Sequence, residues 1–407
     1  MSELPSIEDI VGPGFTEDAR TSRAAIGRYY TDPVVHQIEQ DRVFGHEWNY
    51  LGHHSELPDP GNYLVRDVAG ESIYVIRGKD DELRAFFNVC QHRGHQLLQG
   101  QGTIGNVVVC PYHAWSYGTD GTLRGAPKMR HVPDFCAADV ALTPVRLELI
   151  GGFMFANLDP DAPSLREMAP RFEPALLSMV AESADLHPVR TRSFEIAANW
   201  KVVTENFLEA YHVEFSGPAH QGLARVIDTE TYEFDIDGRT IEYRAAGGAP
   251  DTLPYQSNPH DAFTNTANAP FQQIFLFPHT TFSVFPGTNL VFVYNMAPNG
   301  VDRCAEEITY FTLDAEMTEP SRTAEAYISE QLNEEDIALV EAVQRGVGSR
   351  GYRPGRLMVD AEEEEGWSEH FVHHFNQLNV AALRRHEPSS ASATRIAAAS
   401  ASARPNE

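Results

Sequence analysis

Two pairs of side chains that can bind a metal occur within residues 90–113, which read CQHRGHQLLQGQGTIGNVVVCPYH. Cys90 and His92 form one pair and Cys110 and His113 form the second, so each pair can lie on a loop and face a shared point. Two cysteines and two histidines suit tetrahedral zinc, but zinc sites more often place like residues side by side. A cysteine beside a histidine in both pairs favours a [2Fe-2S] cluster, with the thiolates on one iron and the imidazoles on the other.

A second group of possible ligands lies in residues 199–220, NWKVVTENFLEAYHVEFSGPAH. The spacing of its apolar residues predicts a helix from Trp200 to Tyr211. Glu209 and His212, three residues apart, would then share one face. Because a carboxylate often supports a metal-binding imidazole, this pair indicates a metal ligand and its partner.

An inward-facing acid is predicted in residues 331–352, QLNEEDIALVEAVQRGVGSRGY. Asp336 shares a predicted helical face with four apolar residues, whereas Glu334 and Glu335 lie off that face. The four apolar residues are Leu339, Val340, Val343 and Val347. A carboxylate on an apolar face needs a charged partner or a metal, so Asp336 is a candidate ligand.

Two kinds of structure must position these residues. From Asn62 to about Arg124, short alternating runs separated by GKDD and TDG predict hairpin-linked strands and a small all-β domain. Beyond Asp159 the pattern mixes helices with strands. Helical spacing occurs at residues 162–182 and 320–346, two β-rich runs surround PGTN within residues 272–296, and a third run follows at 305–313. The chain is therefore predicted to be α+β, with an antiparallel sheet packed by helices in the second domain.

The composition excludes several functions. The 407 residues carry a formal net charge of −27, which disfavours binding to a nucleic-acid backbone. No apolar run approaches the ~20 residues of a membrane span and no signal-peptide pattern opens the chain, so a cytoplasmic location is expected. Cys136 and Cys304 are expected to be small buried hydrophobic residues. The Ser- and Ala-rich tail from Glu387 is expected to be disordered.

The residues around both motifs resemble one known family. CQHRG and CPYHAWSYGTDG are similar to the two halves of the Rieske motif, and NWK, EN, an acid and two histidines resemble the catalytic domain of Rieske non-haem iron oxygenase α subunits. The resemblance runs roughly from Tyr30 to Phe375. It implies a small all-β Rieske [2Fe-2S] domain over 45–158 and a helix-grip (START-like) catalytic domain with a mononuclear iron site over 159–385. Residues 1–44 would pack on the catalytic domain, and 386–407 would form a disordered tail.

The resemblance also implies two ligand sets. The cluster ligands would be Cys90, His92, Cys110 and His113. The ligands of a mononuclear Fe(II) would be His212, His220 and Asp336, a 2-His-1-carboxylate set. Seven residues separate the two histidines where the family has four, so the segment VEFSGPA is expected to bulge or leave the helix.

Three further residues take roles from the same resemblance. Glu209 matches the acid that joins the cluster of one subunit to the iron of its neighbour, between His113 of the adjacent chain and His212. A homotrimer is therefore implied. Asn206 and Tyr211 would lie close to the iron, with core packing as the main role of Tyr211.

The substrate is the least constrained feature. ENFLEAYH, FSVFPGTNL, VEAVQRGVGSRGY and EHFVHHF resemble the branch that oxidises quaternary ammonium compounds such as carnitine, glycine betaine and proline betaine. Aromatic side chains of residues 272–296 could floor a pocket that attracts a trimethylammonium group, although such side chains are also ordinary core. They are Phe275, Phe277, Phe282, Phe285, Phe292 and Tyr294. The alternatives are an α subunit that hydroxylates aromatic rings or aromatic acids and, as a non-enzyme, a Rieske electron-transfer protein.

The resemblance finally implies a multicomponent reaction. O₂ would be the co-substrate, and electrons from NAD(P)H would come through a separate flavin/iron-sulfur reductase. No G-x-G-x-x-G fingerprint followed by a predicted helix is found, which agrees with a separate reductase. Hydroxylation of an N-methyl group would release formaldehyde and the demethylated amine.

Overall fold

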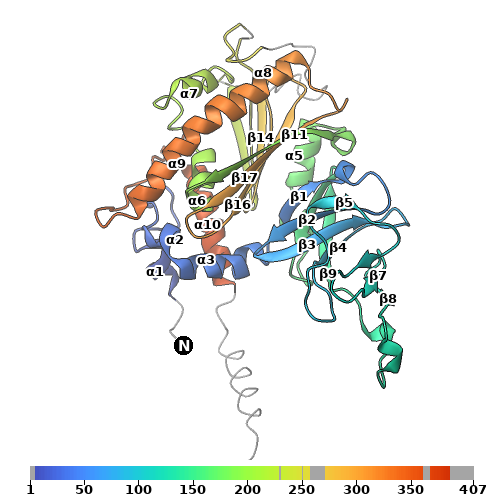
Figure 1. Ribbon diagram of the computed structural model, residues 1–407. Helices are drawn as coiled ribbons and strands as arrows, with labels where there is room; N and C mark the ends of the chain where they lie inside the picture. The colour runs from blue at the N-terminus through green and yellow to red at the C-terminus, as the bar shows by residue number, and fades with distance from the viewer. Residues whose placement is uncertain (1–4, 229–230, 250, 257–270, 361–366, 386–407) are drawn as a thin grey trace, which may run out of the picture.

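The computed structural model describes residues 5–228, 231–249, 251–256, 271–360 and 367–385, which form a larger and a smaller lobe (Figure 1). A seven-stranded antiparallel sheet is the centre of the larger lobe, in the order β11-β17-β16-β15-β14-β13-β12. Successive side chains of a strand point to opposite faces, so each strand contributes to two cores. The strands are β11 (His187–Ile196), β12 (Glu233–Asp237), β13 (Thr240–Ala245), β14 (Phe271–Leu276), β15 (Thr280–Val284), β16 (Val291–Pro298) and β17 (Cys304–Thr312).

The prediction of two β-rich runs within residues 272–296 is wrong by one strand. The first run forms two strands, β14 and β15, which pair with each other around a turn containing Phe277 and Pro278. Proline cannot donate a hydrogen bond to a ladder, so the strand ends there. The third run is β17, as predicted.

Helices cover one face of this sheet (Figure 1). Apolar side chains from the helices and from the sheet form a single core there, in which Trp200, Phe375 and Tyr310 are fully buried. The helices are α6 (Trp200–Phe207), α7 (Pro218–Leu223), α8 (Glu319–Tyr327), α9 (Asn333–Val347) and α10 (His370–Arg384). A π-helical turn, Ile328–Leu332, joins α8 to α9 within the helical stretch predicted at 320–346.

The N-terminal segment packs on the same core through α1 (Ile7–Val11), α2 (Arg28–Thr31) and α3 (Pro33–Glu39). Lys201 Nζ lies 2.7 Å from Glu39 Oε1, and both side chains are fully buried. Removing either partner of such a pair leaves a buried charge, which makes the contact a strong anchor. The domain boundaries at 44/45 and 158/159 stay predictions, and the tail at 386–407 lies outside the described residues.

The other face of the sheet packs against α4 (Leu165–Met168), α5 (Phe172–Met179) and one edge of the smaller lobe. Phe282, Val293 and Phe311 of the sheet meet Trp48, Phe153 and Phe155 of the smaller lobe in this core. The two lobes are therefore joined by a continuous apolar interface.

The smaller lobe holds a second seven-stranded sheet, ordered β1-β10-β9-β4-β3-β2-β5, and a three-stranded sheet, β6-β7-β8. The α+β fold class predicted from the sequence is confirmed, with β-structure throughout this lobe. Its strands are β1 (Asn49–His53), β2 (Asn62–Val68), β3 (Glu71–Arg77), β4 (Leu83–Phe87), β5 (Gln101–Thr103), β6 (Val108–Val109), β7 (Ser116–Tyr117), β8 (Leu123–Gly125), β9 (Pro144–Ile150) and β10 (Phe153–Asn157). Among the described residues no helix is long and apolar enough to cross a bilayer.

Two helix predictions need correction. Helix α6 ends at Phe207 rather than Tyr211, and Leu208 is its C-cap. In α9 the buried stripe consists of Asn333, Val340, Gln344 and Val347. The predicted inward residues Leu339 and Val343 are instead exposed, because the stripe is rotated toward α6 and the N-terminal helices.

Candidate metal centres and the adjoining cavity

Two loops of the smaller lobe carry the predicted cluster ligands. Cys90 and Cys110 begin equivalent turns, in which Cys90 O accepts a hydrogen bond from Gly94 N–H at 2.9 Å and Cys110 O accepts one from Ala114 N–H at 3.0 Å. Gly94 and Ala114 both have positive φ, at 72° and 58°. Glycine adopts this conformation without strain, which explains the residue type at position 94.

The four side chains converge and fit a cluster. Both thiols are 2% exposed, and the rings of His92 and His113 lie 4.6 Å apart between centroids. The Nδ1 atoms of His92 and His113 are buried without a hydrogen-bond partner among the described residues. A buried polar atom without a partner is costly, and coordination by both Nδ1 atoms would remove that cost.

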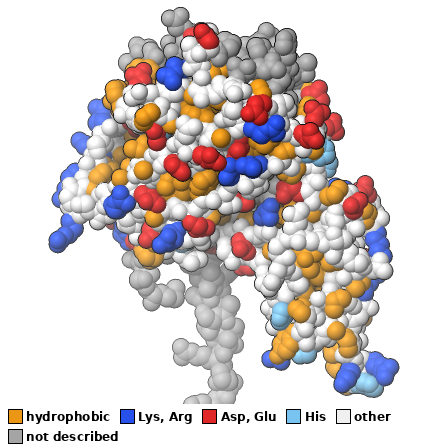
Figure 2. All heavy atoms as spheres, turned by 45° about the horizontal axis from the view of Figure 1, so that its top comes forward, with side chains coloured by type: hydrophobic (Ala, Val, Ile, Leu, Met, Phe, Trp, Pro, Cys, Tyr) orange, Lys and Arg blue, Asp and Glu red, His pale blue; other side chains and the backbone are white. Residues whose placement is uncertain are grey.

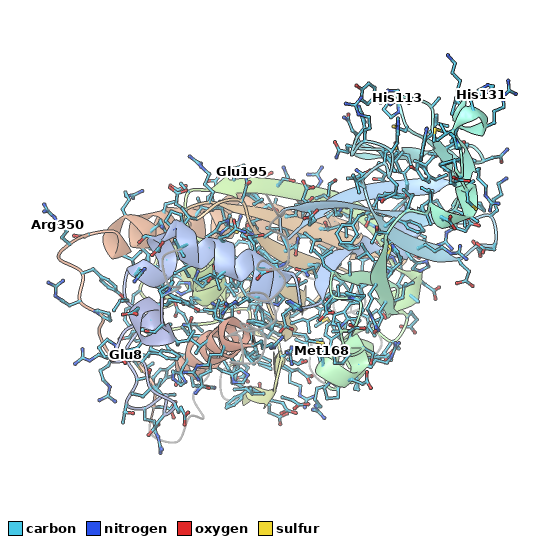
Figure 3. All side chains as sticks on the ribbon, turned by 90° about the horizontal axis from the view of Figure 1, so that it is seen from below. Glu8, His113, His131, Met168, Glu195 and Arg350 are labelled. Atoms are coloured by element: carbon cyan, nitrogen blue, oxygen red, sulfur yellow. The ribbon has the colours of Figure 1, made fainter. Side chains whose placement is uncertain are left out.

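Neighbouring aromatic residues hold this centre in place. The Trp115 ring stacks on His92 with a centroid distance of 4.6 Å, and Tyr117 Oη lies 3.3 Å from Cys90 Sγ. Tyr117 Oη already accepts a hydrogen bond from Gln91 N–H, so its own proton can be donated to the sulfur. Figure 3 shows His113 and His131 at the far end of the smaller lobe.

The other cysteines and a nearby histidine lie outside this centre. His95 is exposed and beside the carbonyl of Gln96, as expected for a residue outside the motif. Cys304 is fully buried as predicted, but Cys136 is exposed, because it lies in the irregular segment between β8 and β9.

Three elements of the larger lobe bring together His212, His220 and Asp336. One ligand atom from each lies within 4.8 Å of the others. His220 Nε2 is 3.0 Å from Asp336 Oδ1, and His212 Nε2 is 3.5 Å from the same oxygen. The arrangement leaves one side of the triad facing a cavity, which suits a 2-His-1-carboxylate iron site with open positions.

The long spacing between the histidines is absorbed by a change of helix. After α6 ends, residues 208–216 form turns that carry Glu209 and His212, and the chain then enters α7. Pro218 occupies the first turn of α7, where its missing N–H costs nothing, and His220 is 1% exposed within that helix. VEFSGPA thus lies outside α6, as expected, but the helix ends earlier than predicted, and Pro218 and Ala219 of this segment already belong to α7.

Each imidazole also has a carboxylate on its other nitrogen. Glu209 accepts from His212 Nδ1 and, through Oε2 at 3.0 Å, from the backbone N–H of His212. Glu335 Oε2 lies 2.8 Å from His220 Nδ1. These contacts fix both rings with Nε2 directed at Asp336, the arrangement that supports metal-binding histidines.

Glu335 is the clearest site residue that the sequence prediction missed. The sequence predicts that Glu335 lies off the inward face of its helix. In the structure its carboxylate contacts His220 Nδ1 and also accepts hydrogen bonds from the backbone N–H groups of Ala219 and His220, each at 3.1 Å. The reason is that α7 packs against the start of α9, on the side where Glu335 projects. No local sequence signal identifies such a contact between distant segments.

The charges of the triad balance one another. Burial lowers the pKa of His212, but hydrogen bonds to Asp336 and Glu209 outweigh this and raise the pKa to about 9. Burial likewise opposes charge on Asp336, yet the two imidazoles hold its pKa below the usual range. The site is therefore built around positive charge at its centre, which a divalent cation would supply.

A cavity of about 670 Å³ adjoins the triad. Asn206 lines it, with Nδ2 3.5 Å from His212 Nε2. Tyr211 also lines it but is 44% exposed, so the prediction that Tyr211 is a core residue is wrong. The principal aromatic residues of the wall are Phe207, Tyr243, Phe271, Phe285, Phe292 and Tyr294.

The aromatic prediction holds for half of its members. Phe285, Phe292 and Tyr294 line the cavity. Phe275 and Phe277 pack in the helical core around Phe375, and Phe282 points to the opposite face of the sheet. Strand alternation explains the position of Phe282. Phe275 and Phe277 lie in the same core as the three cavity residues but do not line the cavity.

The two ligand sets, one on a β-lobe and one between helices and a large antiparallel sheet, define an oxygenase with two iron centres. Residues 47–136 match the Rieske [2Fe-2S] domain, and residues 183–384 match the ring hydroxylating alpha subunit (catalytic domain). The carnitine monooxygenase oxygenase subunit of Escherichia coli (strain K12) is 35% identical over 380 residues, which are 93% of this chain and 98% of that protein. The chloroplastic choline monooxygenase of Amaranthus tricolor is 28% identical over 357 residues, 86% of this chain and 75% of that protein.

Solved structures agree with this assignment. The quaternary ammonium Rieske monooxygenase CntA in complex with L-carnitine superposes with a TM-score of 0.80 at 32% identity. The match covers 94% of this chain and 100% of that one. Naphthalene 1,2-dioxygenase from Rhodococcus sp. matches at 20% identity with a TM-score of 0.71, which reflects the shared fold. The chain belongs to the Rieske non-haem iron oxygenases, as an oxygenase subunit with a catalytic domain. The predicted resemblance is confirmed. Because the chain has the catalytic domain, the alternative of a Rieske electron-transfer protein is rejected.

Proposed function

We propose that this protein is the oxygenase component that hydroxylates or N-demethylates a small quaternary ammonium compound. The observation that carries the proposal is the aromatic cavity that opens directly onto the predicted iron ligands. Aromatic faces attract a desolvated trimethylammonium group by ~2 kcal/mol or more. The substrates for which the similar proteins are named or with which they were crystallised, carnitine, γ-butyrobetaine and choline, all carry this group.

In this proposal His212, His220 and Asp336 hold the mononuclear iron, and the cluster is held by Cys90, His92, Cys110 and His113. Iron bound there would supply the redox chemistry that activates O₂ for oxidation of a C–H bond. Glu209 and Glu335 keep the Nδ1 protons on the two imidazoles and so leave Nε2 free as the ligand atom. The aromatic wall holds the substrate near the triad and excludes water.

A homotrimer is proposed because the two centres lie in different lobes of one chain. Figure 1 places β6-β7-β8 at the far end of the smaller lobe, whereas α6 and α7 lie in the larger one. Both centres have exposed aromatic neighbours. Tyr112 contacts His113 with tilted rings and is 53% exposed, and Phe215, close to Tyr211, is 75% exposed. Such surfaces suit contact between subunits, with Glu209 joining His212 to the partner's cluster.

Mixed assemblies test this route. The Cys110→Ser chain lacks the cluster and the His212→Ala chain lacks the iron site, so each alone should be inactive. Co-expressed with different affinity tags and purified through both tags, they should regain turnover if electrons cross a subunit boundary. A mixed assembly that contains both chains and stays inactive would contradict the intersubunit path.

The substrate class is tested with anaerobically iron-loaded protein, a reductase, NADH and O₂. The proposed reductase is a flavin/iron-sulfur protein. The proposed location of this multicomponent system is the cytoplasm. Carnitine, γ-butyrobetaine, choline and glycine betaine form one panel, and aromatic acids form the other. Oxidation of a quaternary ammonium compound, with formaldehyde matching the amine where a methyl group is attacked, is the expected result. Uptake of O₂ with aromatic acids alone would contradict the substrate class and favour ring hydroxylation.

A further inference from the structure

Glu306 is a buried acid in the wall of the cavity, on strand β17. It shares the helix-covered face of the sheet with Cys304, Ile308 and Tyr310 and is 3% exposed. The cavity is otherwise bounded near this point by Tyr294, Leu332 and Asn333. An acid among apolar residues at alternate positions of a strand is unusual, because burying a carboxylate is costly without a partner.

Glu306 differs from the four other glutamates that are at most 5% exposed in having no cationic partner. Glu39 pairs with Lys201, Glu47 with Arg239 and Arg385, Glu242 with Arg244, and Glu325 with Arg190 and Arg192. Among the described residues, the hydrogen-bond partner of Glu306 is Asn333, whose Nδ2 donates to Oε1 at 2.7 Å. Asp336, another acid, raises the pKa of Glu306 rather than lowering it as a cation would.

No lysine or arginine of the described residues lines the cavity either. The internal segments outside the described residues, 229–230, 250, 257–270 and 361–366, contain no lysine or arginine in their sequences. Apart from the iron ligands His212 and His220, which are paired with Glu209, Glu335 and Asp336, the described lining offers Glu306 no cationic side chain, so a cation paired with it would come from a bound molecule. Because the described wall of the cavity contains acids and no lysine or arginine, the cavity best suits a substrate whose main charged group is cationic.

We propose that Glu306 is a specificity-determining residue, whose carboxylate supplies the counter-charge for the quaternary ammonium group of the substrate. This inference rests on the proposed function and adds the residue that selects for positive charge. A quaternary nitrogen has no N–H, so its attraction to the carboxylate is coulombic, and Glu306 can keep its hydrogen bond from Asn333. In the low-dielectric cavity this attraction is much stronger than in water.

The charge state of Glu306 agrees with this role. Burial raises its pKa to about 7, and the hydrogen bond from Asn333 opposes the rise. A bound cation would favour the ionised form. An assay at pH 8 therefore examines the carboxylate in its charged state.

A positioning role is the competing explanation. Asn333 lies one turn before Asp336 in α9, so Glu306 could act through Asn333 on the orientation of the iron ligand. The two roles differ in what they affect. Counter-charge affects cations only, whereas positioning affects iron content and every substrate.

Glu306→Gln separates them, because the amide keeps the volume and the Oε1 acceptor but removes the charge. The probes are choline, γ-butyrobetaine and the neutral isostere of choline in which carbon replaces nitrogen. Binding to the anaerobic, iron-loaded protein, in the oligomeric state in which it is purified, is measured by titration calorimetry. Iron content and the Rieske absorption spectrum are further readouts. Glu307→Gln, the next residue on the opposite face of β17, is the matched control.

We expect the Kd of choline and γ-butyrobetaine to rise about tenfold or more in Glu306→Gln, with isostere binding and iron content unchanged. Loss of iron, or equal weakening of cation and isostere, would replace the inference with a positioning role. An unchanged Kd for the cations would overturn it. If the wild-type protein oxidises none of the quaternary ammonium panel, the proposed function itself fails, and that result is read from the wild type without the variant.

Discussion

His212 and His220 direct their Nε2 atoms at one oxygen of Asp336, from 3.5 Å and 3.0 Å. The three residues come from the turn after α6, from α7 and from α9, and Asp336 lies 116 residues after His220 in the sequence. Both Nδ1 atoms are meanwhile held by carboxylates, Glu209 and Glu335. Carboxylates of the chain itself thus orient both imidazoles, as expected of a supported metal site.

Replacing His220 by alanine should remove the iron and leave the cluster. Because two ligands hold a divalent ion much less tightly than three, turnover should fall below about 1% of wild type, while the brown Rieske colour persists. Iron analysis, the visible spectrum and NADH-driven O₂ uptake measure the three quantities. His95→Ala changes an exposed histidine outside both centres and should leave all of them unaltered. Full activity in His220→Ala would mean that His220 is no ligand.

Glu335→Gln should weaken iron binding without abolishing it. The amide can still contact His220 Nδ1 but no longer carries the charge that supports the imidazole, and loss of such a contact typically costs about 10- to 100-fold in affinity. Competition with a chelator measures the change. Glu334→Gln alters the neighbouring exposed acid of the same helix turn and should match wild type. Equal behaviour of the two variants would refute the role of Glu335.

Cys110→Ser should abolish the cluster absorption, since serine is a poor ligand for iron–sulfur clusters. Mononuclear iron can still be loaded, so metal content should fall by the two irons of the cluster and no more. Cys136→Ser, at the exposed cysteine, should keep the full spectrum. A cluster that survives in Cys110→Ser would point to a different ligand set.

His53 should make the protein sensitive to acid. Burial, with a smaller effect of His54, lowers its pKa from 6.5 to about 3, and Nε2 lies 3.1 Å from Ser183 O across the contact between the lobes. The unfolded chain then binds the proton first, so the stabilisation from His53 is complete above pH 6.5. It is lost at ~1.4 kcal/mol per pH unit as the pH falls toward 3.

The urea midpoint of unfolding, followed from pH 7.5 to pH 5, measures this dependence. His53→Gln removes one titrating group and should show a shallower fall with pH, together with a lower midpoint at pH 7.5. His131→Gln, at an exposed histidine, should follow the wild-type curve. Parallel curves for His53→Gln and wild type would show that His53 does not govern the acid response.

Much of this protein could be predicted from its sequence. The pairs Cys90/His92 and Cys110/His113 are close in the chain, and the turns that hold them depend on local residues such as Gly94. Strand alternation and helical spacing were sufficient for the α+β class and for the helices at 320–346. Asp336 was a candidate ligand on a predicted face of which Leu339 and Val343 are in fact exposed, so the resemblance to the family was also needed there. These features depend on periodicity and short-range spacing, which the sequence records directly.

The rest was decided by tertiary contacts. Helix α6 ends at Phe207, and the chain then turns to bring His212 and His220 to the site. No strong helix-breaking residue in the local sequence marks that point. Glu335 joins the site only because α7 packs on the start of α9. Glu306 is distinguished by having no lysine or arginine beside it among the described residues, and that property exists only in the folded chain. Each outcome depends on which distant segments meet, and a one-dimensional pattern does not contain that information.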